Sequence, residues 1–188
     1  MRQPEKDMIE QIFSATEQLM AQGGLHSLSM HKIAKYAGIS AGTIYIYFKN
    51  KEELLEKFAQ HLFFKFENTL WQHIDESCSY FEQYRQMWWN VWSFLKDNPT
   101  ITVNLNQYQA LPSFCDMCKE WENESYWIKF CQKAVKDDVL CDLSGHILFL
   151  LSIGSAIKLS VDCYFLHKEL SNDVLESVIE RTWRSIQK

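Results

Sequence analysis

Residues 28–54 constrain the fold most, because they combine two short helical segments across a glycine. Ser29 is a favourable helix N-cap, and apolar residues follow it at helical spacing. Gly38 suits the left-handed residue with which such a helix ends, and Ser40 can cap a second helix that runs to about Tyr47. Two short helices joined by a tight glycine turn predict a helix-turn-helix.

The two faces of this helix pair differ in character. Ile33, Ala34, Ile39 and Ile44 are predicted to pack the helices together. Small side chains at the start of the second helix would let it approach a DNA major groove closely, and a threonine there can bond a base edge or a phosphate. The residues predicted to contact DNA are Ser29, Lys32, Ser40, Ala41, Gly42, Thr43, Tyr45, Tyr47, Lys49 and Lys51.

Charge separates this region from the rest of the chain. Residues 23–51 contain four lysines and no Asp or Glu, although the formal net charge of the whole chain is -5. Residues 1–51 carry six Lys or Arg against four Asp or Glu, and the remainder carries 13 against 20. A phosphate backbone is the natural partner of the basic segment.

For the motif alone, an ordinary helical hairpin is the alternative. At the first helix, Arg2 and Lys6 could contact phosphate or belong to a solvated terminus.

The run IAKYAGISAGTIYIYFKNKEELL resembles the amino-terminal signature of TetR-family transcriptional repressors. In that family a helix-turn-helix is followed by Tyr-x-x-Phe or a close variant, and then by a Lys that opens the next helix. The resemblance covers about the first quarter of the chain. It implies a ligand-responsive DNA-binding protein. One departure is Ile46, which stands where many relatives have a polar or basic residue.

Beyond this motif, helical periodicity continues to the end of the chain. With 47% hydrophobic residues, 12 Phe, 8 Tyr and 7 Trp but only 6 Gly and 3 Pro, we expect an all-α protein with an aromatic-rich interior. Residues 1–50 are predicted to form a three-helix helix-turn-helix DNA-binding domain and residues 51–188 a helical effector-binding and dimerisation domain. The nine expected helices span residues 5–22, 29–37, 40–47, 51–74, 79–96, 102–109, 117–135, 142–167 and 171–186.

The last two segments predict a homodimer interface. Residues 142–167 are apolar on most faces and rich in small residues, and residues 171–186 carry an apolar stripe. The family resemblance implies that the last two helices form a four-helix bundle across a two-fold axis. The alternative is an internal core of one subunit. The candidate interface residues are Gly145, Ser152, Gly154, Ser155, Val178 and Trp183.

Aromatic residues crowd two of the middle helices and predict an effector pocket. Asp162 interrupts an apolar helix, and a buried carboxylate needs a partner, which could be Lys158, a hydroxyl or a cationic ligand. Aromatic faces with a carboxylate suit flat lipophilic cations, although a core can use the same rings for volume. Other members of the resembled family take acyl chains or neutral metabolites. The candidate pocket residues are Trp88, Trp89, Trp92, Trp121, Tyr126, Trp127, Phe130 and Asp162.

Metal and membrane chemistry find little support in the sequence. The six cysteines lack the paired spacing of a zinc site, so we expect reduced thiols and neither a metal nor a cofactor. The most apolar run, residues 147–157, is shorter than the roughly 18 residues that a membrane span needs. No signal peptide is evident, and we expect a cytoplasmic protein without a membrane partner.

The sequence thus predicts a repressor that a small hydrophobic effector releases from a palindromic operator. An effector-independent DNA-binding regulator is one alternative. A helical small-molecule-binding enzyme is the other, but no Ser-His-Asp arrangement, glycine-rich phosphate loop or carboxylate pair supports it.

Overall fold

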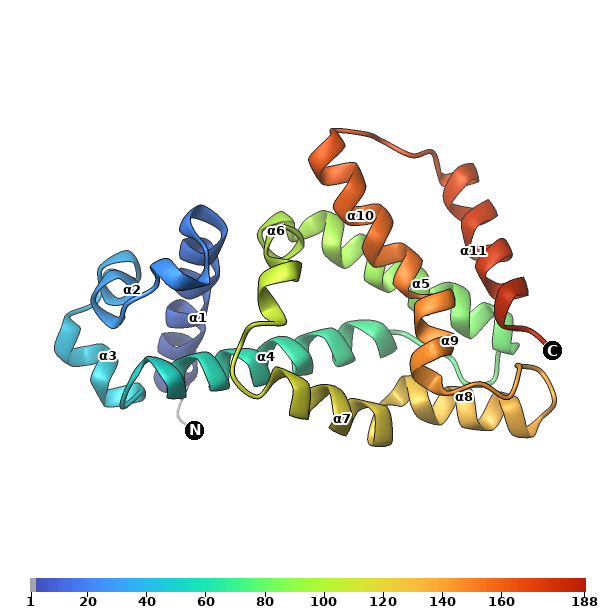
Figure 1. The fold of residues 1–188 in the computed structure, drawn as a ribbon, viewed down its shortest axis with the longest axis horizontal. Coiled ribbons are helices and arrows are strands. Elements are labelled where there is room, and N and C mark those ends of the chain that lie inside the picture. Colours follow the sequence, from blue (N-terminus) through green and yellow to red (C-terminus); the bar gives the residue numbers. More distant parts are fainter. Residues whose placement is uncertain (1–2) are drawn as a thin grey trace. The chain divides into compact units, whose positions relative to one another are not determined.

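The computed structural model describes residues 3–188, and within this range its regular structure is entirely helical apart from one isolated bridge between Leu140 and Gln187 (Figure 1). The contacts group the chain into two compact units. The first comprises the residues up to 62 together with 103–115, and the second comprises residues 63–102 and 116–188. The domain boundary predicted at residue 50 stays a prediction. The first compact unit extends past that residue to residue 62 and also includes residues 103–115.

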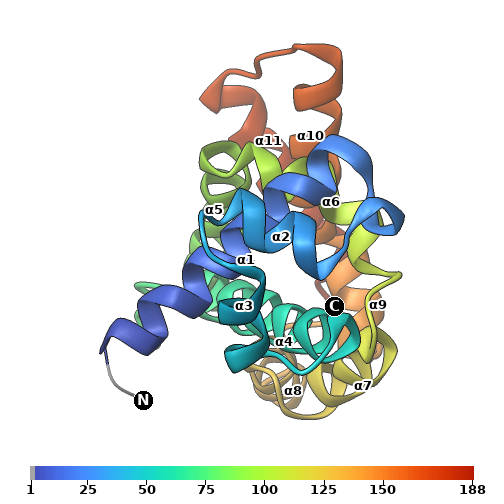
Figure 2. The same cartoon turned by 90° about the vertical axis from the view of Figure 1, so that its left-hand side faces the viewer.

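The first unit contains the helix-turn-helix and the helix that braces it (Figure 2). The side-chain amides of Asn104 and Gln107 donate to the backbone carbonyl oxygens of Glu17 and Met20 at 2.8 and 3.2 Å. These bonds hold the helix of residues 99–108 against the helix of residues 3–23. The elements that contribute to this unit are α1 (Gln3–Gly23), η1 (Leu25–Ser27), α2 (Met30–Tyr36), α3 (Ala41–Tyr47), the start of α4 (Lys51–Trp71) and the end of α6 (Pro99–Tyr108).

The second unit is a helical body built around α5 (Tyr80–Asp97), against which α10 and α11 pack (Figure 1). The carboxy-terminal part of α4 belongs to this unit and contacts α7 and α8 through the Glu67 carboxylate. That carboxylate accepts from the Trp121 indole N–H at 2.7 Å and from the Tyr126 backbone N–H at 2.6 Å. The remaining helices of this unit are α7 (Phe114–Glu124), α8 (Tyr126–Lys136), α9 (Gly145–Leu151), α10 (Gly154–Leu166) and α11 (Asn172–Ile186).

The all-α prediction is confirmed, and every one of the nine expected segments is helical in the described residues. Two of them are broken in the middle. Ser125 divides α7 from α8 because its side chain caps the new helix by accepting from Ile128 N–H at 3.2 Å, with Glu67 satisfying a second N–H. Ser152, whose φ of -129° and ψ of -92° are not helical, divides α9 from α10.

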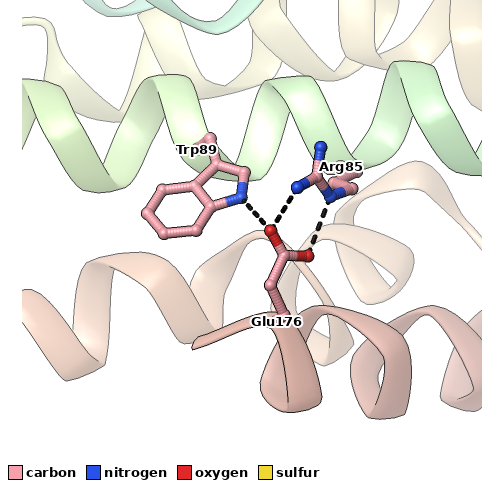
Figure 3. A network of polar contacts seen from close by, with 3 residues as sticks. All are labelled: Arg85, Trp89 and Glu176. Atoms are coloured by element: carbon pink, nitrogen blue, oxygen red, sulfur yellow. Dashed lines mark hydrogen bonds and ion pairs between the residues drawn. The ribbon is translucent and has the colours of Figure 1, made fainter. Parts of the chain in front are cut away.

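Polar contacts between α5 and α11 hold the body together (Figure 3). The Glu176 carboxylate accepts from the Arg85 Nε at 2.8 Å and from the Trp89 indole N–H at 2.9 Å. The hydrogen bond from the Arg85 guanidinium lowers the pKa of Glu176, although burial opposes this shift. A second contact between the two helices joins Tyr84 of α5 to Thr182 of α11, whose hydroxyl oxygens lie 2.7 Å apart. One carboxylate therefore joins two α5 side chains to α11.

The stretch Gly145–Leu166 is more apolar than the sequence analysis expected. Its 22 residues have a mean hydropathy of 1.6 and are long and apolar enough, by length and composition alone, to cross a membrane. The run of residues 147–157 is shorter because it ends before Lys158, although one charge does not end an apolar segment. A core or interface helix passes the same test, and only 28% of the apolar window is buried within this chain.

Candidate nucleic-acid interface

The turn between α2 and α3 has the geometry expected from its residues. Ser29 caps α2 by accepting from the Lys32 backbone N–H at 3.3 Å. Gly38 follows α2 with a φ of 68°, a left-handed conformation that a side chain would strain. The turn is closed by the next residue, because the Ile39 N–H donates back to the Ala34 carbonyl oxygen of α2 at 3.0 Å. The tight turn therefore fixes the angle between the two helices.

The amino-terminal turn of α3 is ordered by its own hydroxyl groups. Ser40 Oγ accepts from the Thr43 backbone N–H at 3.0 Å and lies 2.7 Å from Thr43 Oγ1. Both residues are partly or fully exposed, so the pair remains accessible to a ligand. A hydroxyl pair at a helix N-terminus can donate to phosphate or to a base edge.

The inner and outer faces of α2 and α3 separate as predicted. Ile33, Ala34 and Ile44 are buried, and Ile39 is half-buried. Of the residues predicted to contact DNA, the described structure leaves each at least partly accessible: Lys32, Ser40, Gly42, Tyr45 and Lys49 are exposed, and Ser29, Ala41, Thr43, Tyr47 and Lys51 are intermediate. Their contact with DNA stays a prediction.

One residue of this face was undervalued by the sequence analysis. Ile46 on α3 is 79% exposed, the most accessible large apolar side chain in the described part of the chain. Exposing an isoleucine side chain to water is unfavourable. On the second helix of a helix-turn-helix, such a side chain can contact a thymine methyl group. In the sequence, Ile46 lies between Tyr45 and Tyr47, two residues predicted to contact DNA, and this position was the available signal. The sequence analysis treated Ile46 only as a departure from the polar or basic residue of many relatives.

The lysines of this surface differ in whether their ammonium groups already form hydrogen bonds within the chain. Lys32 Nζ donates to the Ser27 carbonyl oxygen at 2.9 Å and so partly serves the local structure. Lys49 and Lys51 flank the start of α4, where Asn50 Oδ1 accepts from Glu53 N–H and the Glu53 carboxylate accepts from Lys49 N–H. These caps occupy part of the α4 N-terminus, so the lysine side chains are the available phosphate ligands there. Arg2 lies outside the described residues.

The predicted aromatic effector pocket is largely a packed core. Trp88 and Trp127 are fully buried, and their indole N–H groups donate to Ser155 Oγ and the Gly145 carbonyl oxygen. The other rings, Trp89, Trp121, Tyr126 and Phe130, also have ring or hydrogen-bond partners within the chain.

Of the three partners that the sequence allows for Asp162, the structure shows Lys158. Asp162 is not buried without a partner: its side chain is 44% exposed and accepts from Lys158 Nζ at 2.8 Å, one helical turn away. Of the eight predicted pocket residues, Trp92 lines the cavity described below. Because Lys158 already balances the Asp162 carboxylate, Asp162 gives no reason to expect a cationic ligand.

Several predicted interface residues serve contacts inside one protomer, and their place in a dimer interface stays a prediction. Ser152 is fully buried, and Trp183 packs against Tyr84 with ring centroids 5.2 Å apart. Ser155 accepts the Trp88 indole, and a Cβ on Gly145 would meet the Ile128 side chain at 2.2 Å. Gly154 and Val178 are half-buried. The small residues permit close packing within the chain.

Seven of the exposed apolar side chains lie on α9, on the last turn of α10 and at the start of α11. Leu150, Phe165 and Leu166 are each more than half exposed. The others of this group are Ile147, Leu151, Tyr164 and Val174. We call these seven residues the apolar face. Exposed large apolar side chains of this kind favour an interaction site.

Comparison with known proteins adds independent observations. The family model described as "Bacterial regulatory proteins, tetR family" matches residues 12–58, and that described as "Tetracyclin repressor-like, C-terminal domain" matches residues 79–187. An HTH-type transcriptional regulator from Haemophilus influenzae is 55% identical over 188 residues, with both chains covered completely.

Solved structures agree. A TetR-family transcriptional regulator from Haemophilus influenzae, 55% identical, has a TM-score of 0.94 with both chains fully covered. One from Vibrio parahaemolyticus, 30% identical, has a TM-score of 0.83 over 95% of this chain and 98% of that one. FadR from Bacillus subtilis in complex with stearoyl-CoA has a TM-score of 0.76 over 94% and 98%; at 20% identity this likeness shows the fold alone.

Proposed function

Because this chain belongs to the TetR family of DNA-binding transcriptional regulators, which are not enzymes, we propose that it is a homodimeric repressor released from a palindromic operator by a small hydrophobic effector. It would act in the cytoplasm, where its operator is. The observation that carries the DNA-binding part is the capped, accessible amino-terminal turn of α3, presented on a basic segment of an acidic chain.

The exposed apolar face supports the dimer. Burying it against a second copy satisfies the side chains of α9 and α10 that one protomer leaves in water, and homodimers with two-fold symmetry are the commonest soluble assemblies. In such a dimer, α3 of each protomer would enter a major groove about 34–36 Å from the other. The operator is then a palindrome with half-sites one helical turn apart.

Two helices support coupling between effector and operator. α4 and α6 are continuous helices that each contribute residues to both compact units. A ligand that shifts either helix in the second unit therefore acts on the first unit as well. A preference of roughly 1–3 kcal/mol for the state that does not bind DNA would weaken operator binding about 5- to 150-fold.

The test is DNA binding by the full chain. Duplexes from the DNA flanking its gene, compared with scrambled duplexes of equal length, should reveal one palindrome bound selectively by a dimer. The proposal fails if no flanking duplex is preferred. If a palindrome is bound but no hydrophobic ligand raises the melting temperature or changes operator affinity, the effector-independent regulator is the better description.

A further inference from the structure

A cavity of about 280 Å³ lies in the second unit between α5, the start of α6, α10 and the connection to α11. Its inner wall is apolar: Trp92, Leu95 and Leu175 line it, and each is less than a tenth exposed. Trp92 is held in place by stacking on Trp88, with ring centroids 5.6 Å apart. The cavity thus has a rigid wall that can contact the apolar body of a small ligand.

An unused hydrogen-bond donor lies in the lining. Ser160 is 7% exposed, and among the described residues its Oγ is the one buried side-chain polar atom without a partner. Buried hydroxyls elsewhere in the chain do have partners. Thr102, which lines the same cavity, donates to the Leu95 carbonyl oxygen at 2.8 Å, and Ser152 donates to the carbonyl oxygen of Leu148. A buried polar group without a partner calls for an acceptor from outside the chain.

The charges around the cavity favour an anion. Lys96 and Lys168 line it, and neither forms an ion pair with a carboxylate of residues 3–188. Glu169 is the acidic residue of the lining. The nearby Asp162 is already bound to Lys158. Two ammonium groups therefore meet one carboxylate, which leaves positive charge to be balanced.

The end of α10 fixes one of these lysines at the cavity. His167 ends the helix in a left-handed conformation, with φ 49° and ψ 43°, and the Lys168 N–H donates back to the Cys163 carbonyl oxygen at 3.0 Å. This C-cap turns the chain sharply, so that residues 168–170 line the cavity before Ser171 caps α11. The lysine position is thus set by the helix end.

We propose that this cavity binds a small amphipathic carboxylate, whose head accepts from the Ser160 hydroxyl and is balanced by Lys96 and Lys168 while its apolar body packs on Trp92, Leu95 and Leu175. The site replaces the cationic pocket that the sequence predicted. It rests on the proposed function only in naming this carboxylate as the effector; binding itself needs no DNA.

The first test uses octanoate, octanol and octylammonium, which share one alkyl chain and differ in the charge of the head. Calorimetric titration of the full chain should show octanoate binding at least about tenfold more tightly than the other two. Equal or tighter binding of octylammonium overturns the proposal, because the lysines would then not select the head group.

Variants locate the site. Ser160→Ala should weaken octanoate at least about tenfold while leaving the melting temperature of the free protein unchanged or higher, because it removes an unsatisfied hydroxyl. Lys96→Gln with Lys168→Gln should abolish the preference for octanoate over octanol. Lys133→Gln, which removes an exposed lysine of α8 outside the lining, is the matched control and should change neither. Unchanged octanoate affinity in Ser160→Ala overturns the assignment.

Thiol protection gives a readout independent of those variants. Cys163 lines the cavity, whereas Cys78 is exposed elsewhere. Octanoate should slow alkylation of Cys163 several-fold and leave Cys78 unaffected, as measured by peptide mass spectrometry. Equal rates with and without octanoate place the ligand elsewhere and contradict the proposal.

Operator binding separates this inference from the proposed function. If octanoate does not bind but a palindromic operator is still selected, the cavity assignment fails and the regulator remains. If octanoate binds with the expected variant pattern but leaves operator affinity unchanged, the site stands and its role as the effector site fails.

Discussion

The hydroxyl oxygens of Ser40 and Thr43 lie 2.7 Å apart at the first turn of α3, and Ser40 also accepts the Thr43 backbone N–H. Thr43→Ala removes one hydroxyl and keeps the backbone cap, so folding should be preserved. A Thr43 hydroxyl that reads a base edge predicts a loss of about 1–3 kcal/mol in binding to the correct operator and little change on scrambled DNA. Fluorescence anisotropy with both duplexes measures the difference.

The control for that substitution is the cap itself. Ser40→Ala should cost about 0.5–2 kcal/mol in stability, which thermal denaturation would detect, because it leaves an N–H of the α3 terminus unsatisfied. A Thr43→Ala variant that loses as much stability as Ser40→Ala would show that its effect on DNA is indirect.

Lys49 and Lys51 should act through phosphate rather than through bases. Replacing either with Ala should weaken binding to operator and scrambled duplex alike and reduce the slope of log K against log salt by about one unit. Lys133→Ala, an exposed lysine on α8, serves as the matched control. A selective loss at the operator alone would instead assign the lysine to base recognition.

Ile46 predicts a contact with a thymine methyl. Ile46→Ala should weaken operator binding, and replacing the contacted thymine with deoxyuridine, which removes only the methyl group, should weaken it similarly. Combined, the two changes should cost little more than either alone, because they delete the same contact. Fully additive losses at every thymine of the operator would exclude this contact.

The exposed apolar face predicts the oligomeric state. Leu150→Glu and Leu166→Glu place a charge where 60% and 58% of the side chain is exposed in one protomer, so each should fold but sediment as a monomer with weakened palindrome binding. Phe64→Glu changes a side chain that is 70% exposed outside this face and should leave the dimer intact. A wild-type chain that sediments as a monomer at micromolar concentration contradicts the proposal. These positions are cleaner than Gly154, where an added Cβ would lie 3.2 Å from the Phe149 carbonyl oxygen.

The Glu176 carboxylate predicts a pH dependence of stability. Its pKa is lowered in the folded state, chiefly by the hydrogen bond from Arg85, so its contribution is present above the unfolded pKa of a glutamate and is lost as the pH falls through the folded value. Because both side chains are about a third or more exposed, the contribution should be no more than about 1 kcal/mol. Denaturant unfolding between neutral and acidic pH measures it.

Glu176→Gln keeps an acceptor for the Trp89 indole and removes the charge. This variant should be less stable than the wild type near neutral pH, and the difference should shrink on acidification. A constant difference at all pH values would mean that the ion pair contributes nothing and that the amide fits the site poorly.

Local sequence was sufficient for the helix-turn-helix, because its determinants act within a few residues. The caps at Ser29 and Ser40 bond their own first turns, and Gly38 adopts the positive φ that its missing Cβ permits. The alternation of buried and exposed side chains on α2 and α3 also followed from periodicity. The charge contrast between this segment and the body is fixed by composition alone.

Tertiary structure decided the rest, because a side chain's partner far along the chain cannot be read from spacing. Periodicity could not place a helix break at Ser125, which depends on a carboxylate from Glu67, nor show that Trp183 meets Tyr84 inside one protomer. It suggested a buried Asp162, whereas the fold leaves that residue partly exposed and bound to Lys158. The hydroxyl left without a partner at Ser160 became visible only once the neighbouring helices had packed, since burial and hydrogen-bond satisfaction are properties of the assembled core.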